Sequence, residues 1–222
     1  MSSGTIYLLD GSPRSDIIRD LVNYFNIDID LRSSKVAPEF AALFPLKKSP
    51  ALVTPYDVKI HQLLAILPYL YKICPKCEKL LGSTEEEKAL VTMFMSFFNS
   101  DFGETAIGVV LPCSGRGIFY GPSVAALRDK FDAQGQYLND ILQHSRYLTN
   151  NYEPNLADFF GVRVFKFSRY YLFDKDFAER YPHVAKWVDD VANNYQFTKA
   201  IRGLKPFSES FVIEKPNGLK PL

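Results

Sequence analysis

The hydrophobic pattern of this 222-residue chain changes once, and that change limits what the chain can fold into. Residues 5–9 form an apolar run typical of a buried strand, residues 12–25 have helical spacing, and residues 26–31 alternate like a second strand. From Ser83 onward the periodic runs have the spacing of helices. The pattern therefore predicts an α/β part followed by an all-helical part.

A second feature is the stretch 44–53, FPLKKSPALV, in which Ser49 and Pro50 stand directly before the apolar run ALV. A turn, another short strand and a helix beginning near Gln62 follow. A proline at this place either begins a strand, where its missing N–H does little harm, or forms a cis peptide bond, which is rare outside X-Pro pairs. The residues by themselves leave both interpretations open.

The order of elements in the first part is β-α-β-α-β-β-α, which is typical of a thioredoxin-like mixed sheet flanked by helices. We expect this domain to cover residues 1–76 and an all-α domain to cover residues 84–205. Residues 206–222 contain Pro and Lys at several positions and predict a surface tail.

Several signals organise the helical part. A long helix is expected over residues 122–147 because its apolar residues recur at helical spacing. Asn155 and Asp158 have the spacing of a capping box at the start of another helix. The segment HVAKWVDDV places Trp187 and three valines on one helical face, which is typical of a core-facing helix.

Composition excludes several classes of function. The net charge is +1 and no basic run is longer than Lys47-Lys48, so nothing indicates a nucleic-acid partner. No apolar stretch reaches the length of about 18 residues that a membrane span needs, and the N-terminus lacks the pattern of a signal peptide. Three cysteines cannot form a disulfide framework, which favours a reducing compartment and a cytoplasmic location.

Several separated segments resemble the cytosolic glutathione transferases: SPRS after the first strand, FPLKKSPALV, HQLLAI at a helix start, NLAD, and PHVAKWVDDV. They span roughly residues 4–195, so the resemblance covers nearly the whole chain. It implies the glutathione transferase fold, which joins a thioredoxin-like N-terminal domain to an all-α C-terminal domain. It also implies a homodimer with glutathione as its ligand.

Within that superfamily, the segments SGTIYLLDGSPR, EFAALFPLKKSPAL, FFNSDF and PHVAKW resemble the N-terminal domain of the gamma subunit of eukaryotic translation elongation factor 1B, especially in fungi. That resemblance implies a scaffold in protein biosynthesis that holds the nucleotide-exchange subunit of the elongation factor 1 complex. The alternative is a stand-alone glutathione-dependent transferase or isomerase that acts on an electrophilic small molecule. The residues favour the scaffold, with the enzyme as the alternative.

In glutathione transferases, a hydroxyl or thiol near the end of the first strand hydrogen-bonds to the glutathione sulfur and favours its thiolate form. By resemblance, Ser12 or Tyr7 is the candidate catalytic donor here. Ser12 stands where serine-type enzymes place their donor, although a Ser before Pro more often caps a helix. Tyr7 stands where tyrosine-type enzymes place theirs, although a Tyr in the middle of a strand is more often part of the core.

The same resemblance assigns a glutathione-binding site to Lys48, Ser49, Pro50, Gln62 and Leu63. Pro50 follows the residue that would bind the cysteinyl backbone, Gln62 matches the residue that holds the γ-glutamyl end, and Lys48 matches one that reaches the glycyl carboxylate. The family usually has a serine at the position of Leu63, and losing one charge-assisted hydrogen bond costs about 1.5–3 kcal/mol. The site is therefore expected to be weakened, and Pro68 should also bend the helix that follows Gln62.

Cys74 and Cys77 form a Cys-Pro-Lys-Cys motif, which invites a redox or zinc interpretation. A zinc site needs about four ligands, and beyond these two the chain offers only Cys113 and three dispersed histidines, so no metal is expected. A redox motif normally opens a helix after a strand, whereas this one follows a helix and precedes the interdomain linker. The placement therefore favours cysteines without a special role.

Overall fold

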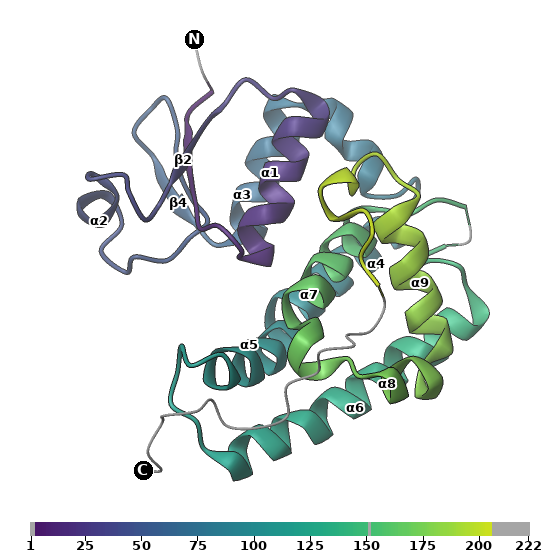
Figure 1. Cartoon of the computed structure of the whole chain (residues 1–222). Helices are drawn as coiled ribbons and strands as arrows, with labels where there is room; N and C mark the ends of the chain where they lie inside the picture. Colours follow the sequence, from purple (N-terminus) through teal and green to yellow (C-terminus); the bar gives the residue numbers. More distant parts are fainter. Residues whose placement is uncertain (1–2, 151, 206–222) are drawn as a thin grey trace. The chain divides into compact units, whose positions relative to one another are not determined.

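The structure is a computed structural model that describes residues 3–150 and 152–205 (Figure 1). The chain divides into two compact units, residues 1–85 and residues 86–222. The first is an α/β unit and the second is helical, as the hydrophobic pattern predicts. The predicted surface tail, residues 206–222, lies outside the described residues.

The first unit is built on a mixed four-stranded sheet with the strand order β2-β1-β3-β4. Its elements in chain order are β1 (Thr5–Leu8), α1 (Pro13–Phe25), β2 (Asp30–Ser33), α2 (Phe40–Leu43), β3 (Ala51–Val53), β4 (Lys59–His61), α3 (Leu63–Ile73) and a 3-10 helix, η1 (Pro75–Leu80). β2 is parallel to β1, whereas β3 is antiparallel to both of its neighbours. This is the predicted thioredoxin-like arrangement.

The two faces of the sheet carry different packing partners. Figure 1 shows α1 and α3 side by side on one side of the sheet and α2 on the other. Along β1, Ile6 and Leu8 are buried on one face, and Tyr7 packs on the opposite face against Phe40 and Phe44 of the α2 region. Alternation along β1 thus supplies a core for both sides.

β2 begins four residues later than the predicted strand 26–31. Asn26 is the C-cap of α1 in the left-handed conformation (φ 51°), and the N–H of Ile27 still donates to the Val22 carbonyl at 3.0 Å. Ile27 and Ile29 are buried in the connection, which explains why the segment alternates like a strand without pairing as one.

The helices that follow are α4 (Glu85–Ser96), a π-helical turn, η2 (Phe97–Asp101), α5 (Phe102–Cys113), α6 (Gly121–His144), α7 (Leu156–Leu172), α8 (Lys175–Arg180), α9 (Pro182–Asn193) and the 3-10 helix η3 (Lys199–Ile201). The predicted long helix 122–147 ends at His144. Ser145 adopts an extended conformation there, and Tyr147 is fully buried in the loop that follows, so its apolar character reflects loop packing.

The π-helical turn η2 was not predicted. The N–H of Phe102 donates to the carbonyl of Phe97, five residues back, so the turn holds an extra residue. Phe98 within this turn and Phe102 directly after it are both buried, and the centres of their rings lie 5.6 Å apart. The turn has the sequence FFNSD, and its mixture of aromatic and polar residues does not distinguish a π-helical turn from an α-helical one.

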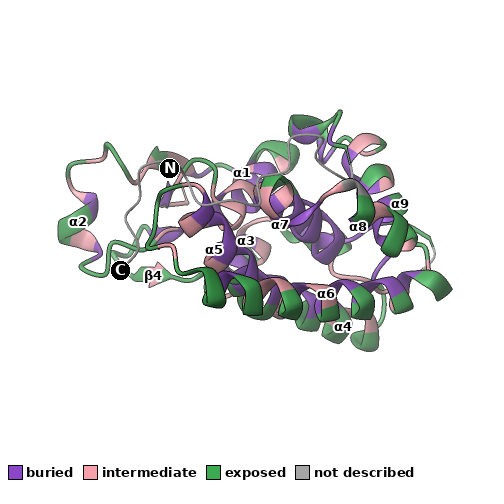
Figure 2. Cartoon of the chain, turned by 60° about the horizontal axis from the view of Figure 1, so that its bottom comes forward, coloured by how far each residue is buried: buried purple, intermediate pink, exposed green. Residues whose placement is uncertain are grey.

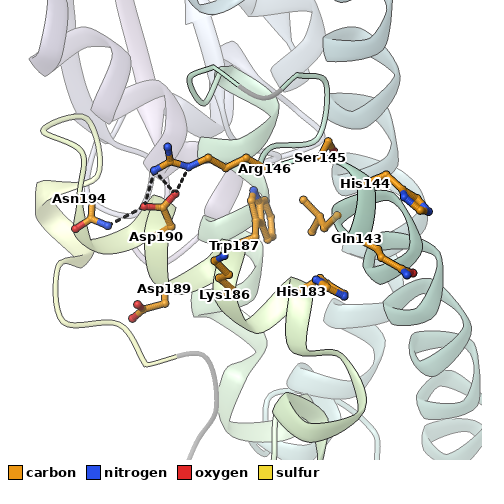
Figure 3. Close-up of a pocket in the computed structure, with 11 residues that line it drawn as sticks. Gln143, His144, Ser145, Arg146, His183, Lys186, Trp187, Asp189, Asp190 and Asn194 are labelled. Carbon is orange, nitrogen blue, oxygen red and sulfur yellow. Dashed lines mark hydrogen bonds and ion pairs between the residues drawn. The ribbon is translucent and has the colours of Figure 1, made fainter.

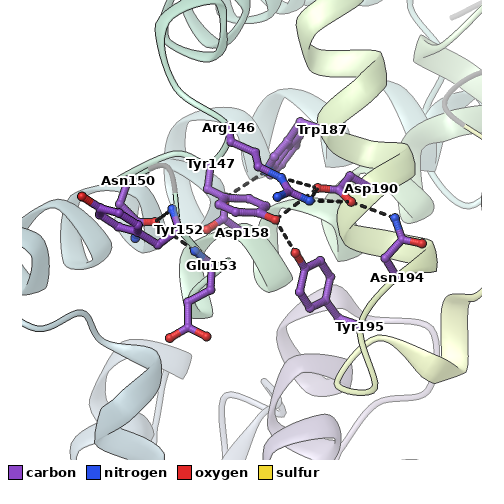
Figure 4. A network of polar contacts seen from close by, with 10 residues as sticks. All are labelled: Arg146, Tyr147, Asn150, Tyr152, Glu153, Asp158, Trp187, Asp190, Asn194 and Tyr195. Carbon is purple, nitrogen blue, oxygen red and sulfur yellow. Dashed lines mark hydrogen bonds and ion pairs between the residues drawn. The ribbon is translucent and has the colours of Figure 1, made fainter.

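The start of α7 has the predicted capping box. The Asn155 side chain accepts a hydrogen bond from the Ala157 N–H, and the Asp158 carboxylate accepts one from the Asn155 N–H, both at 3.0 Å. Asp158 is fully buried and also accepts from the Leu148 N–H at 3.0 Å and the Trp187 indole at 2.8 Å. One carboxylate thus joins α7, the loop before it and α9 (Figure 4).

Figure 2 shows α7 buried along most of its length, whereas one side of α6 is exposed. Gly161 of α7 lies so close to its neighbours that an added Cβ would meet Trp187 at 2.7 Å and Phe98 at 2.8 Å. The valines and Trp187 predicted on one face of α9 are all buried. Among the described residues, no helix combines the length and the apolar character that crossing a membrane requires.

Candidate functional site

The strand register brings predicted binding residues to one end of the sheet. β1 and β3 are antiparallel with Tyr7 opposite Ala51, and β3 and β4 are antiparallel with Ala51 opposite His61. The next residues along the register are Pro50 before β3 and Gln62 after β4. The turn that leads from β1 into α1 begins at the same end, so segments far apart in sequence converge there.

The loop before β3 contains a cis peptide bond between Ser49 and Pro50, which is one of the two interpretations that the residues left open. Pro50 is buried and Ser49 half-buried, whereas Lys48 is exposed. Lys47 has a φ of 50°, which is uncommon for a residue with a side chain, and its N–H donates to the Phe44 carbonyl at 2.8 Å. The loop therefore combines a buried anchor with an exposed basic side chain.

Ser12 is the N-cap residue of α1, but its hydroxyl makes no capping hydrogen bond. Its carbonyl oxygen accepts from the N–H groups of Ser15 and Asp16, both at 2.9 Å. The preceding turn is closed by the Ser15 hydroxyl, which accepts from the Leu9 N–H at 3.0 Å. The half-buried Ser12 hydroxyl is therefore not committed to helix capping, contrary to the plainer interpretation of a Ser before Pro.

The Tyr7 hydroxyl has a partner within the sheet unit. It donates to the Glu39 carboxylate at 2.8 Å, and the same carboxylate oxygen accepts from Arg32 at 3.0 Å. Burial and the hydrogen bond to Glu39 raise the pKa of Tyr7, whereas the pKa of Glu39 is lowered by its backbone, Tyr7 and Arg32 hydrogen bonds. The Tyr7 side chain is thus buried and protonated, and its single hydroxyl hydrogen is donated to Glu39.

Gln62 is exposed and has an unusual backbone conformation, with φ 79° and ψ 130°. Its carbonyl oxygen accepts from the N–H groups of Ala65 and Ile66, both at 3.1 Å, and so begins α3. A side-chain-bearing residue at positive φ is sparsely populated and is often found at functional sites. Leu63 is 1% exposed, so its side chain belongs to the core and only its backbone can face a ligand. α3 continues through Pro68 to Ile73.

Sequence reasoning missed the partners of Tyr7. Glu39 and Arg32 lie 32 and 25 positions along the chain from it, on α2's N-cap and on β2, and no spacing rule connects them. The only local signal is that Arg32 lies opposite Tyr7 in the parallel β1–β2 pair, which requires the register to be known. Tertiary pairing therefore decides which of the two candidate hydroxyls has a partner.

The cysteine motif lies at the junction of α3 and η1. Cys74 is at once the C-cap of α3 and the N-cap of η1, so the motif opens a short helix as well as following one. Cys77 is fully buried and Cys74 half-buried. Among the described residues, no cluster of three or more His, Cys, Asp or Glu side chains is arranged to hold a metal ion.

A hollow of about 790 Å³ lies between the end of α6 and α9 (Figure 3). Buried Leu142 and Trp187 contribute to its lining, and Arg146 forms an ion pair with Asp190 at 3.2 Å at its edge. The remaining lining residues are polar and include the basic Lys186 and the acidic Asp189, and none of the predicted site residues is among them. This hollow does not by itself indicate a class of ligand.

Comparison with known proteins points to one superfamily. Residues 2–72 match the model of the glutathione S-transferase N-terminal domain. Glutathione S-transferase Y-2 of Pichia kudriavzevii is 34% identical over 200 residues, which cover 87% of this chain and 97% of that protein.

Elongation factor relatives match as well. Elongation factor 1-gamma 2 of Saccharomyces cerevisiae is 29% identical over 195 residues, and the match covers 86% of this chain but 47% of that protein. This chain thus spans about half the length of that relative. The solved structure of the GST-like domain of elongation factor 1-gamma from the same yeast superposes with a TM-score of 0.81 at 26% identity, covering 98% of this chain and all of that domain.

Proposed function

The chain belongs to the glutathione S-transferase family, and on that premise we propose that it binds reduced glutathione and transfers it to an electrophilic small molecule. The relative of matching length is named a glutathione S-transferase, and this chain covers nearly all of it. The observation that carries the proposal is the Ser12 hydroxyl, which lies at the start of α1 without capping the helix.

Ser12 is the proposed catalytic donor. Its hydroxyl donates a hydrogen bond to the glutathione sulfur and thereby favours the thiolate over the thiol. The N-terminus of the 13-residue helix α1 adds positive potential in the same direction. The thiolate attacks an electrophilic carbon and forms a thioether bond, while the leaving group departs with the electrons of the bond that breaks.

The contacts of Tyr7 support Ser12 as the donor in preference to Tyr7. A phenol that already donates to Glu39 must give up that charge-assisted hydrogen bond before it can serve a thiolate. Its pKa is raised, so it is also a weaker acid than an ordinary tyrosine. We assign Tyr7 a structural role under α2, where it packs against Phe40 and Phe44.

Residues at the same end of the sheet form the proposed glutathione site. The backbone at Ser49, before cis-Pro50, binds the cysteinyl part, and the exposed Gln62 carboxamide binds the γ-glutamyl end. Lys48 attracts the glycyl carboxylate from the surface. Because Leu63 supplies only backbone groups, we expect binding in the micromolar to low-millimolar range.

Calorimetry with reduced glutathione, paired with a chromogenic electrophile assay, tests this function. Ser12→Ala is expected to lower turnover by about a hundredfold while changing glutathione affinity far less, because the donor acts mainly on the developing thiolate. Tyr7→Phe is the matched control, since it removes the other candidate hydroxyl and is expected to leave turnover nearly unchanged. Loss of turnover in Tyr7→Phe alone would transfer the donor role to Tyr7. Absence of heat at ten millimolar glutathione would contradict the proposal as a whole.

A scaffold role is the second candidate, and the superposition on the GST-like domain of elongation factor 1-gamma favours it. In this role the chain holds the nucleotide-exchange subunit of an elongation factor 1 complex. Titration of the purified exchange subunit into the chain tests it directly. If the chain binds that subunit and does not bind glutathione, the scaffold role is supported and the enzymatic role is contradicted. If it binds glutathione and does not bind the subunit, the scaffold role is contradicted.

We further propose that the chain is a homodimer in the cytoplasm. The family resemblance and the three cysteines, all free in the structure, support these two assignments. Fractionation of cells that express a tagged chain tests the location, and the mass in solution tests the dimer.

A further inference from the structure

The Cys-Pro-Lys-Cys motif is the chemically reactive feature that the proposed function does not use. Cys74 and Cys77 lie at the two ends of the first turn of η1, and the Cys77 N–H donates to the Cys74 carbonyl at 2.9 Å. A 3-10 helix has three residues per turn, so side chains three positions apart lie one above the other. The turn thus places the two cysteines close together on one short segment, and the proximity of Cys74 is one of the causes that raise the pKa of Cys77.

The two thiols differ in their access to solvent. Cys74 is half-buried and therefore partly open to solvent, whereas Cys77 is fully buried. Burial, helped by the hydrogen bond and charge of Cys74, raises the pKa of Cys77 to about 12. Cys77 is therefore inert toward reagents in solution, and any first attack must come from Cys74.

We propose that Cys74 and Cys77 form a reversible disulfide, made by exchange with a small disulfide such as glutathione disulfide. The Cys74 thiolate attacks one sulfur of the oxidant, which releases one glutathione thiolate and leaves a mixed disulfide on Cys74. The Cys77 thiol then loses its proton and attacks the Cys74 sulfur, which releases the second glutathione. Two protein thiols are oxidised, and one glutathione disulfide is reduced to two molecules of glutathione.

The surroundings favour the second step over release of the mixed disulfide. The backbone hydrogen bond of the turn keeps Cys77 next to Cys74, so the attacking thiol and its target belong to one short segment and react as an intramolecular pair. Forming the mixed disulfide also removes the negative charge of Cys74, which helps to raise the pKa of Cys77. The Lys79 ammonium acts in the same direction, because its charge lowers the pKa of Cys77.

Oxidation would fix the segment that leads out of the first unit. The bond closes a short loop around Pro75 and Lys76 and ties the end of α3 to the buried turn of η1. η1 is held in turn by Lys79, whose ammonium lies 5.9 Å and 5.3 Å from the ring centres of Tyr24 and Phe25 of α1. We therefore expect the oxidised segment between α3 and η1 to unfold locally less often than the reduced one.

Mass spectrometry of the full chain after incubation with glutathione disulfide tests the site. The expected product is lighter by two hydrogen atoms, with one of its three cysteines still open to alkylation after denaturation. Trypsin cleaves after the exposed Lys76, so the peptides that carry Cys74 and Cys77 should stay joined until a reductant is added. Hydroxyethyl disulfide should give the same product, which separates this reaction from binding at the glutathione site.

Variants decide between this reaction and its alternatives. Cys74→Ser should abolish the product, and Cys77→Ala should stop the reaction at the mixed disulfide on Cys74. Cys113→Ser, a change at the buried third cysteine, should leave the product unchanged. A mixed disulfide that persists in the unaltered chain, a disulfide between two chains, or three open thiols after incubation would each overturn the proposal.

Discussion

At the scale of single residues, Asp158 shows how burial and hydrogen bonding compete. Three N–H groups from different segments donate to its carboxylate, and each favours the charged form. Complete burial acts in the opposite direction and is the larger effect, so the pKa of Asp158 is raised to about 6. The residue that organises the start of α7 therefore also makes the stability of the chain depend on pH.

The free energy of unfolding should fall as pH rises through the range from about 4 to 6 because of this residue. The folded state keeps the proton up to a pKa of about 6, whereas the unfolded chain releases it near 3.8, so folding is linked to proton uptake between these values. The difference corresponds to about 3 kcal/mol, present below pH 4 and lost above pH 6.

Urea unfolding of the unaltered chain and of Asp158→Asn at several pH values measures this effect. The other carboxyl groups are common to both proteins, so their contributions cancel in the difference. The advantage of the unaltered chain should shrink as pH rises from 4 to 6.5. A difference that stays constant or grows over this range would show that the carboxylate remains charged when buried.

Gly161 is a second residue at which a small change, the addition of a Cβ atom, should affect the stability of the chain. An added Cβ would lie under 3.0 Å from both Trp187 and Phe98, two rings that are themselves buried. Gly161→Ala is expected to lower the free energy of unfolding by about 1–3 kcal/mol, because overpacking forces side chains or backbone to move. The single tryptophan of the chain, Trp187, reports the unfolding by its fluorescence.

Gly121→Ala is the matched control for this change. Gly121 begins α6, and an added Cβ there meets nothing closer than 3.9 Å. The substitution should therefore be neutral or should stabilise the chain by about 0.4–1 kcal/mol through the unfolded state. Equal effects at the two glycines would show that helix propensity, and not contact with Trp187, sets the cost at Gly161.

At the scale of elements, α3 carries a proline inside its hydrogen-bonded body. Pro68 is the sixth of 11 residues and is exposed, so it contributes little packing. It cannot donate to the carbonyl four residues back, at Leu64, and its ring crowds that carbonyl. Pro68 therefore destabilises α3, which is the helix that follows Gln62.

Pro68→Ala is expected to raise the free energy of unfolding by about 1–3 kcal/mol, because the helix regains a hydrogen bond and a better helix former. Pro45→Ala, in an exposed loop, is the control and should be neutral or slightly destabilising. Denaturant titration compares the two. A loss of stability in Pro68→Ala would mean that the surrounding structure depends on the kink, and a parallel glutathione titration would show whether Gln62 moves with it.

At the scale of the whole molecule, the chain is nearly neutral, with a net charge of +1 and a sequence pI of about 7.6. Electrostatic repulsion between copies is therefore weak near neutral pH, which permits self-association. Sedimentation equilibrium should give twice the mass of the 25.3-kDa chain at micromolar concentration. A mass of one chain at all concentrations would contradict the homodimer. The domain bounds at residues 76 and 84 stay a prediction, which limited proteolysis can test.

The features of this chain that could be predicted from its sequence are local. The capping box at Asn155 and Asp158, the start of α1 at Ser12-Pro13 and the apolar face around Trp187 all involve residues within a few positions of one another. Such signals follow from helical and strand periodicity, which is why the fold class could be predicted. They fail where a residue serves packing in a loop, as Ile27 and Tyr147 do.

The tertiary fold determines which hydrogen-bonding side chains already have a partner. The sequence offered Ser12 and Tyr7 as alternative hydroxyl donors. The sheet register and the position of Glu39 give the Tyr7 hydroxyl a partner. The burial of Cys77 in the turn that follows Cys74 likewise depends on how η1 packs after α3. The physical reason is common to both cases. A hydrogen bond depends on distance in space, and folding brings together residues whose separation along the chain carries no signal.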